Sequence, residues 1–95
     1  MQNMFVVIVK YVKPLEAVDS VLAEHRKFLE KYFAQKKLVG CGRQNPRVGG
    51  VIIFRAESRE GVWGLVREDP FYKSGVAEYE VIEFVPSLWE SAIGL

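Results

Sequence analysis

The sequence has little that could build a disulfide framework or a metal centre. Its 95 residues include one cysteine and one histidine. A single cysteine cannot form an internal disulfide, and it is compatible with a reducing compartment. One cysteine and one histidine also make a zinc site of the usual kinds improbable. We therefore expect a cytoplasmic protein that uses no metal and no other cofactor.

The sequence also lacks an excess of either charge and a long hydrophobic run. Thirteen basic residues face 12 acidic ones, for a net charge of +1. A dedicated nucleic-acid binder usually has a strong basic excess, so we expect no nucleic-acid partner. No apolar run approaches the roughly 20 residues that span a bilayer, and the first residues do not resemble a signal peptide. We therefore expect no membrane association. A phosphate-binding glycine motif is absent as well.

What is present is typical of one globular domain. Hydrophobic residues make up 49% of the chain and charged residues 26%. These values are too apolar for intrinsic disorder, and the length leaves no room for a second core. We expect a single domain over residues 1–95.

Hydrophobic periodicity predicts alternating strands and helices. The predicted order is strand 4–12, helix 15–36, strand 38–44, strand 51–54, helix 57–68, a helical turn 70–75 and strand 79–85. Asn45, Pro46, Gly49 and Gly50 indicate a turn between the second and third strands. On the first helix the predicted apolar stripe includes Val18, Val21, Leu22, Phe28, Leu29, Tyr32 and Phe33.

This order predicts a ferredoxin-like α+β fold, β-α-β-β-α-β, in which both helices cover one face of an antiparallel sheet. The first and third strands, which are apolar on both faces, would be central. Because the helices cover one face only, the other apolar face needs a partner. We expect a second copy of the chain to cover it, in a homodimer or a higher even-numbered oligomer.

His25 is the first candidate for chemistry. It lies on the apolar stripe of the predicted first helix. One interpretation is a core or boundary histidine with one hydrogen-bond partner. The other is a proton carrier, because imidazole changes its charge near neutral pH.

Asp69 allows two interpretations as well. Followed by Pro70, it is typical of a helix N-cap. It could also orient His25 and favour the protonated imidazole. The two roles can coexist because a carboxylate has two oxygens.

The predicted second strand contains Cys41, Gly42 and Arg43. Its glycines could let a ligand approach the backbone, but Cys41 is more simply a small buried thiol. Arg43 could bind an anion or be solvated near the turn. The aromatic residue Phe71 is most simply part of the packing.

The sequence resembles the YCII-related (YciI-like) family of the dimeric α/β-barrel superfamily. The resemblance lies in the apolar first strand, in His25-Arg26-Lys27-Phe28-Leu29, in Gly42, in Gly49-Gly50, in Asp69-Pro70-Phe71 with Gly75, and in the tract 78–84 followed by Pro86. It implies a sheet-to-sheet dimer and an active-site pair, which map here to His25 and Asp69. Many members have Gly-Pro where this chain has Gly42-Arg43, so Arg43 would reshape the pocket or add positive charge.

The resemblance favours a cofactor-independent lyase or isomerase that acts on a small organic molecule. His25 and Asp69 would be catalytic, and Cys41, Gly42, Arg43 and Phe71 would contact the substrate. One alternative is a non-catalytic dimeric module that binds a small ligand. A haem-binding or O₂-handling protein is a third interpretation, and nothing in the sequence indicates a haem pocket.

Overall fold

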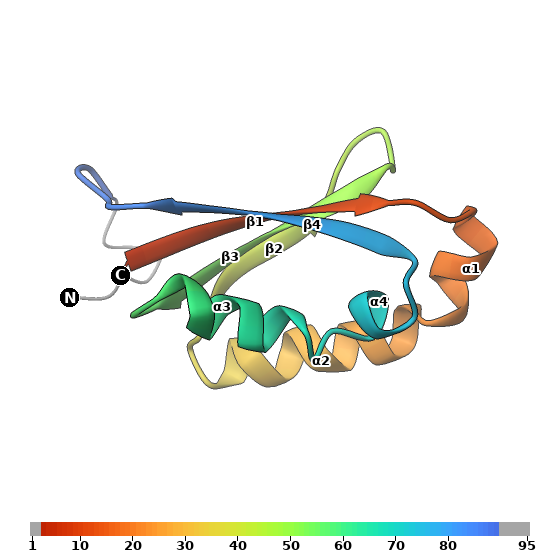
Figure 1. Ribbon diagram of the computed structural model, residues 1–95, viewed down its shortest axis with the longest axis horizontal. Coiled ribbons are helices and arrows are strands. Elements are labelled where there is room, and N and C mark those ends of the chain that lie inside the picture. Colours follow the sequence, from red (N-terminus) through yellow and green to blue (C-terminus); the bar gives the residue numbers. More distant parts are fainter. Residues whose placement is uncertain (1–2, 90–95) are drawn as a thin grey trace.

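The computed structural model describes residues 3–89, so the predicted domain extends beyond them at both ends. The elements of the described part are β1 (Asn3–Tyr11), α1 (Leu15–Ser20), α2 (Leu22–Ala34), β2 (Leu38–Arg43), β3 (Gly49–Ala56), α3 (Arg59–Val66), α4 (Pro70–Lys73) and β4 (Ala77–Phe84). The strands form one antiparallel sheet in the order β2-β3-β1-β4. All helices lie on one face of the sheet (Figure 1). The ferredoxin-like prediction is confirmed, including the central position of β1 and β3.

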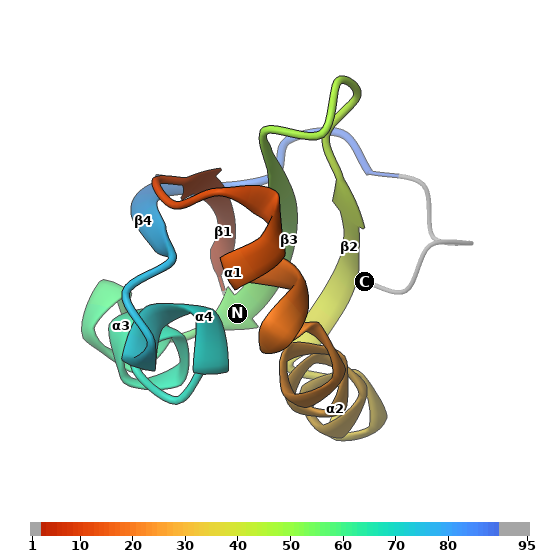
Figure 2. The same cartoon turned by 90° about the vertical axis from the view of Figure 1, so that its right-hand side faces the viewer.

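The core lies between the sheet and the helices. Phe5, Val7 and Val9 of β1 point toward the helices and are buried, because alternate residues of a strand face opposite sides. Viewed along the strands, α2 lies beneath the β2–β3 half of the sheet and α3 and α4 beneath the β1–β4 half (Figure 2). α2 therefore lies beside the edge strand β2, where the cavity described below opens.

The predicted helix over residues 15–36 is wrong in one respect, because it is broken in two. Val21 separates α1 from α2 with φ −117° and ψ 10°, outside the helical range. A β-branched residue loses side-chain freedom in a helix, which makes Val21 a weak point for the break. Phe33, predicted on the apolar stripe, is 61% exposed. It lies about 100° around the helix from the buried Tyr32 and so turns away from the sheet.

The predicted turn role of Gly49 and Gly50 is also wrong, because both residues belong to β3. The turn itself lies at residues 44–48, where the Gln44 amide donates to the Gly49 carbonyl at 2.8 Å. A Cβ atom at Gly49 would lie 1.8 Å from the carbonyl oxygen of Val9. Glycine is therefore required at this position by the close approach of two central strands, which no local sequence rule reveals.

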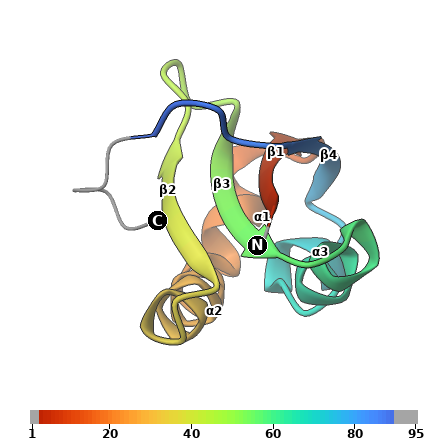
Figure 3. The same cartoon turned by 90° about the vertical axis from the view of Figure 1, so that its left-hand side faces the viewer.

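The face of the sheet opposite the helices is apolar over its centre. Val6, Ile8, Val51 and Ile53 are partly buried on this face, and Ile82 is 44% exposed. The segment after β4 runs over this face toward β2 (Figure 3). None of the helices within residues 3–89 is both long and apolar enough to cross a bilayer.

Candidate active site

His25 and Asp69 meet in space although they are 44 positions apart in the sequence. His25 lies on the buried face of α2, and its side chain is only 11% exposed. Asp69 precedes α4 and is fully buried. The Nδ1 atom of His25 lies 2.7 Å from Oδ1 of Asp69. The structure thus brings the predicted pair into hydrogen-bond contact, beneath the sheet.

Asp69 is held by two further donors. Its Oδ1 accepts the backbone N–H of Phe71 at 2.9 Å, which is the predicted N-cap of α4. Its Oδ2 accepts the hydroxyl of Tyr79 at 2.6 Å. The predicted cap and the contact with His25 therefore coexist, and they share one oxygen. Three donors satisfy a carboxylate that has no access to water, which offsets the cost of its burial.

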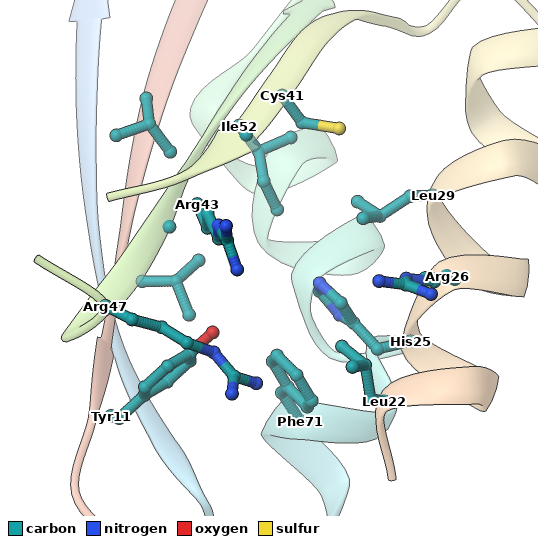
Figure 4. A pocket seen from close by; sticks show the side chains of 14 residues that line it. Tyr11, Leu22, His25, Arg26, Leu29, Cys41, Arg43, Arg47, Ile52 and Phe71 are labelled. Carbon is teal, nitrogen blue, oxygen red and sulfur yellow. The ribbon is translucent and has the colours of Figure 1, made fainter. Parts of the chain in front are cut away.

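This network assigns the proton on the imidazole ring. An ionised carboxylate only accepts hydrogen bonds, so Nδ1 of His25 must be the donor to Asp69. In the neutral ring, Nε2 then carries the free lone pair. Within the described range 3–89, no hydrogen bond engages Nε2. The second nitrogen of the ring is directed into the cavity (Figure 4), where it can accept a proton from a bound molecule.

Aromatic packing fixes the orientation of the imidazole. The Phe71 ring lies parallel to the His25 ring, with centroids 3.8 Å apart and an interplanar angle of 6°. Phe28 flanks the same ring at 6.3 Å. Because Phe71 is one of the first residues of α4, the cap at Asp69 positions both the stacking ring and the carboxylate. Phe71, predicted only as packing or as a substrate contact, therefore holds the histidine.

Tyr79 is a site residue that the sequence interpretation missed. Burial, and then the charge and hydrogen bond of Asp69, raise the pKa of its hydroxyl well above the usual 10. Tyr79 therefore stays protonated and donates to the carboxylate at all ordinary pH values. The signal available in the sequence was strand alternation, because Tyr79 lies two residues before Val81 in β4 and both side chains therefore face the core.

A cavity of about 300 Å³ opens beside the exposed edge of His25 (Figure 4). It lies between α2 and the β2–β3 part of the sheet. All four predicted substrate contacts line it, namely Cys41, Gly42, Arg43 and Phe71. The other lining residues are Val9, Tyr11, Leu22, His25, Arg26, Leu29, Arg47, Gly50, Val51 and Ile52. Of these, Arg26 and Arg47 were not singled out from the sequence, where each looks like an ordinary solvated arginine.

Cys41 differs from its simplest interpretation as a buried thiol. The residue is exposed, and its sulfur is directed toward the cavity (Figure 4). Desolvation against the cavity wall raises the pKa of the thiol. The thiol is therefore neutral at pH 7 and lines the cavity without being an activated nucleophile. Among residues 3–89 there is no cluster of three or more potential metal ligands.

Comparisons with known proteins bear on the family and the fold. The YCII-related domain matches residues 4–85. Among solved structures, the chain is similar to 5-chloro-2-hydroxyhydroquinone dehydrochlorinase from Burkholderia phenoliruptrix AC1100, in complex with 2,5-dihydroxybenzoquinone. The two are 26% identical, and the match covers 85% of this chain and 92% of that chain with a TM-score of 0.74. A search of curated proteins finds no match.

Proposed function

Because the chain belongs to the YCII-related family, we propose that it is a small-molecule enzyme in which His25 transfers protons. One observation carries the proposal. Nδ1 of His25 is bound by the buried Asp69, and Nε2 is left open to a cavity of small-molecule size. A general base needs this combination of a free lone pair, a fixed orientation and a group that stabilises the charge it acquires.

In the proposed reaction, Nε2 removes a proton from an acidic C–H or O–H group of the bound molecule. The imidazolium that forms lies against the Asp69 carboxylate, so its positive charge is neutralised in place. In a lyase, the electron pair released on the substrate expels a leaving group. In an isomerase, the imidazolium returns the proton at another atom. Neither route needs an oxidant, a reductant or a metal, so the enzyme would be cofactor-independent.

The similar dehydrochlorinase indicates which of these routes to test first. Its name describes loss of hydrogen chloride from a chlorinated hydroxyhydroquinone. In such an elimination the base takes a proton, and chloride leaves with the electron pair of the C–Cl bond. The electrons balance within the substrate, and H⁺ and Cl⁻ are the only fragments. We therefore propose elimination from a small acidic ring compound as the first reaction class to assay.

The test compares the wild-type protein with His25→Asn. The asparagine amide can still donate to Asp69, so the fold is retained, but Nε2 is gone. Chloride release from 5-chloro-2-hydroxyhydroquinone is followed first, and then turnover of a panel of phenols, lactones and enols selected by thermal shift. We expect the wild-type rate to exceed that of His25→Asn by about 10²–10⁴-fold, the usual contribution of a general base.

Equal rates in the two proteins would refute a proton-transfer role for His25. Compounds that bind tightly but are turned over by neither protein would indicate the alternative, a non-catalytic binding module. Circular dichroism of His25→Asn separates a lost base from a lost fold.

A further inference from the structure

The charge around the cavity is one-sided, although that of the whole chain is not. Of the fourteen lining residues, three are arginines, Arg26, Arg43 and Arg47, and none is acidic. The carboxylate of Asp69 lies behind His25, is fully buried and is not among the lining residues, and three hydrogen bonds occupy its oxygens. The chain as a whole has a net charge of only +1. The cavity is therefore a local concentration of positive charge.

Arg47 has a structural partner. Its guanidinium forms an ion pair with Asp19 of α1 and lies 5.9 Å from the centre of the Tyr11 ring. The hydrogen bond from Arg47 lowers the pKa of the Asp19 carboxyl, so the pair remains charged at neutral pH. Arg47 thereby ties the β2–β3 turn to α1 and closes one rim of the cavity.

Arg26 and Arg43 have no such partner. Neither makes an ion pair with any residue between positions 3 and 89. Arg26 projects from α2, next to His25, and Arg43 from the end of β2 across the cavity (Figure 4). Gly50 pairs with Arg43 in the sheet and lines the cavity without a side chain that could fill it. Both arginines are exposed, and two guanidinium groups on a cavity without an acidic lining residue favour an anion between them.

We propose that Arg26 and Arg43 form an anion clamp, and that the substrate is a single-ring organic acid held by its carboxylate, enolate or phenolate oxygen. This proposal extends the proposed function. It depends on that function only where the clamp presents the acidic hydrogen of the substrate to Nε2 of His25. Guanidinium groups suit this task because their planar N–H donors match two oxygens at once.

The remaining walls fit the ring of such a molecule. The lining residues Tyr11, Leu22, Leu29, Ile52 and Phe71 are apolar or aromatic. A volume of about 300 Å³ lies at the lower end of the range for small-molecule sites, so a single ring with a few substituents fits. The clamp would also stabilise negative charge that develops on the ring as His25 removes the proton.

The test measures binding without turnover, by following amide chemical shifts during titration. The anionic probes are benzoate and 2,5-dihydroxybenzoquinone, which is ionised at neutral pH, and the neutral comparator is benzamide. The proteins are the wild type, Arg26→Gln, Arg43→Gln and a control, Arg67→Gln, which makes the same charge change on the exposed residue after α3. Circular dichroism checks that each variant is folded.

We expect the wild type to bind both anions more tightly than benzamide, and the affinity to fall as salt is added. Arg26→Gln and Arg43→Gln should each weaken anion binding at least about tenfold, as loss of a charge-assisted hydrogen bond does, and Arg67→Gln should have no effect. Equal affinity for benzoate and benzamide, or equal anion binding by all four proteins, would overturn the clamp. So would the absence of binding to either anion at millimolar concentration.

This result is separable from the test of the proposed function. Failure of the clamp appears as anion affinities that do not depend on Arg26 and Arg43. Failure of the proton-transfer proposal appears as turnover that does not depend on His25, whatever the anion affinities are.

Discussion

Asp69 is the residue at which a structural cap and a catalytic partner can be separated by one substitution. In Asp69→Asn, the amide oxygen can replace Oδ1 and still accept from Phe71 N–H and His25 Nδ1–H. The amide NH₂ replaces Oδ2 and can donate to the oxygen of Tyr79. All contacts remain possible, but each is now between neutral groups. Neutral hydrogen bonds are weaker than charge-assisted ones, but the substitution also removes the cost of burying a charge. We therefore expect Asp69→Asn to lower the free energy of unfolding by about 1 kcal/mol.

Asp69→Ala provides the contrast in stability. This substitution leaves three buried donors without an acceptor, and each unsatisfied donor costs about 1–3 kcal/mol of stability. Because alanine also removes the cost of burying a charge, part of this loss is offset. We expect a net loss of about 3 kcal/mol. For a domain of this size, 1 kcal/mol corresponds to about 4–8 °C in Tm. The melting temperature of Asp69→Asn should therefore lie about 4–8 °C below that of the wild type, and that of Asp69→Ala about 12–24 °C below it.

Activity should follow a different order from stability. Asparagine cannot neutralise an imidazolium, and its NH₂ group can turn toward His25 and favour the wrong ring tautomer. Asp69→Asn should therefore lose turnover by orders of magnitude while remaining folded, as orienting carboxylates do in other acid–base sites. Nitrogen chemical shifts of the imidazole report the tautomer directly. Full turnover in Asp69→Asn, with an unchanged tautomer, would refute the catalytic role and leave Asp69 as a cap.

Three other predictions concern pH, strand packing and assembly. Burial, together with the charge and hydrogen bond of Asp69, raises the pKa of Tyr79, so the unfolded state loses this proton first as pH rises above about 10. The contribution of Tyr79 to stability is therefore present below pH 10 and falls by about 1.4 kcal/mol per pH unit above it. Tyr79→Phe should flatten that slope in denaturant titrations, and an unchanged slope would contradict the raised pKa. Gly49→Ala should destabilise by about 1–3 kcal/mol or more because its Cβ would meet a backbone carbonyl, whereas Gly42→Ala meets nothing within 4 Å; equal melting temperatures of the two variants would argue against the strand packing. We expect a homodimer through the open face of the sheet, measured by light scattering and disrupted by Val6→Glu; a wild-type monomer of 10.8 kDa would exclude it.

The order of the elements was predictable because each depends on residues close together in the chain. The apolar run of β1 predicted a central strand with two apolar faces, since neighbouring residues of a strand face opposite sides, but which of the two faces meets the helices was decided by the fold. Asp69 followed by Pro70 predicted the start of α4, because a cap acts within one helical turn. Helical spacing placed His25 on the buried face of α2. The same local reasoning did not detect the break at Val21, where the chain changes direction to cover the end of the sheet.

Contacts between distant segments were decided by the tertiary structure alone. The requirement for glycine at Gly49 depends on how closely β1 approaches β3, and the third contact of Asp69 depends on the register that places Tyr79 beneath the sheet. The residues themselves gave His25 and Asp69 as separate candidates, and their pairing was expected only from the family resemblance. Arg26 is exposed, as its sequence context suggests, and only the packing of α2 beside β2 places it on the same cavity as Arg43. Local patterns fix which face of an element a residue occupies, but only packing fixes what that face meets.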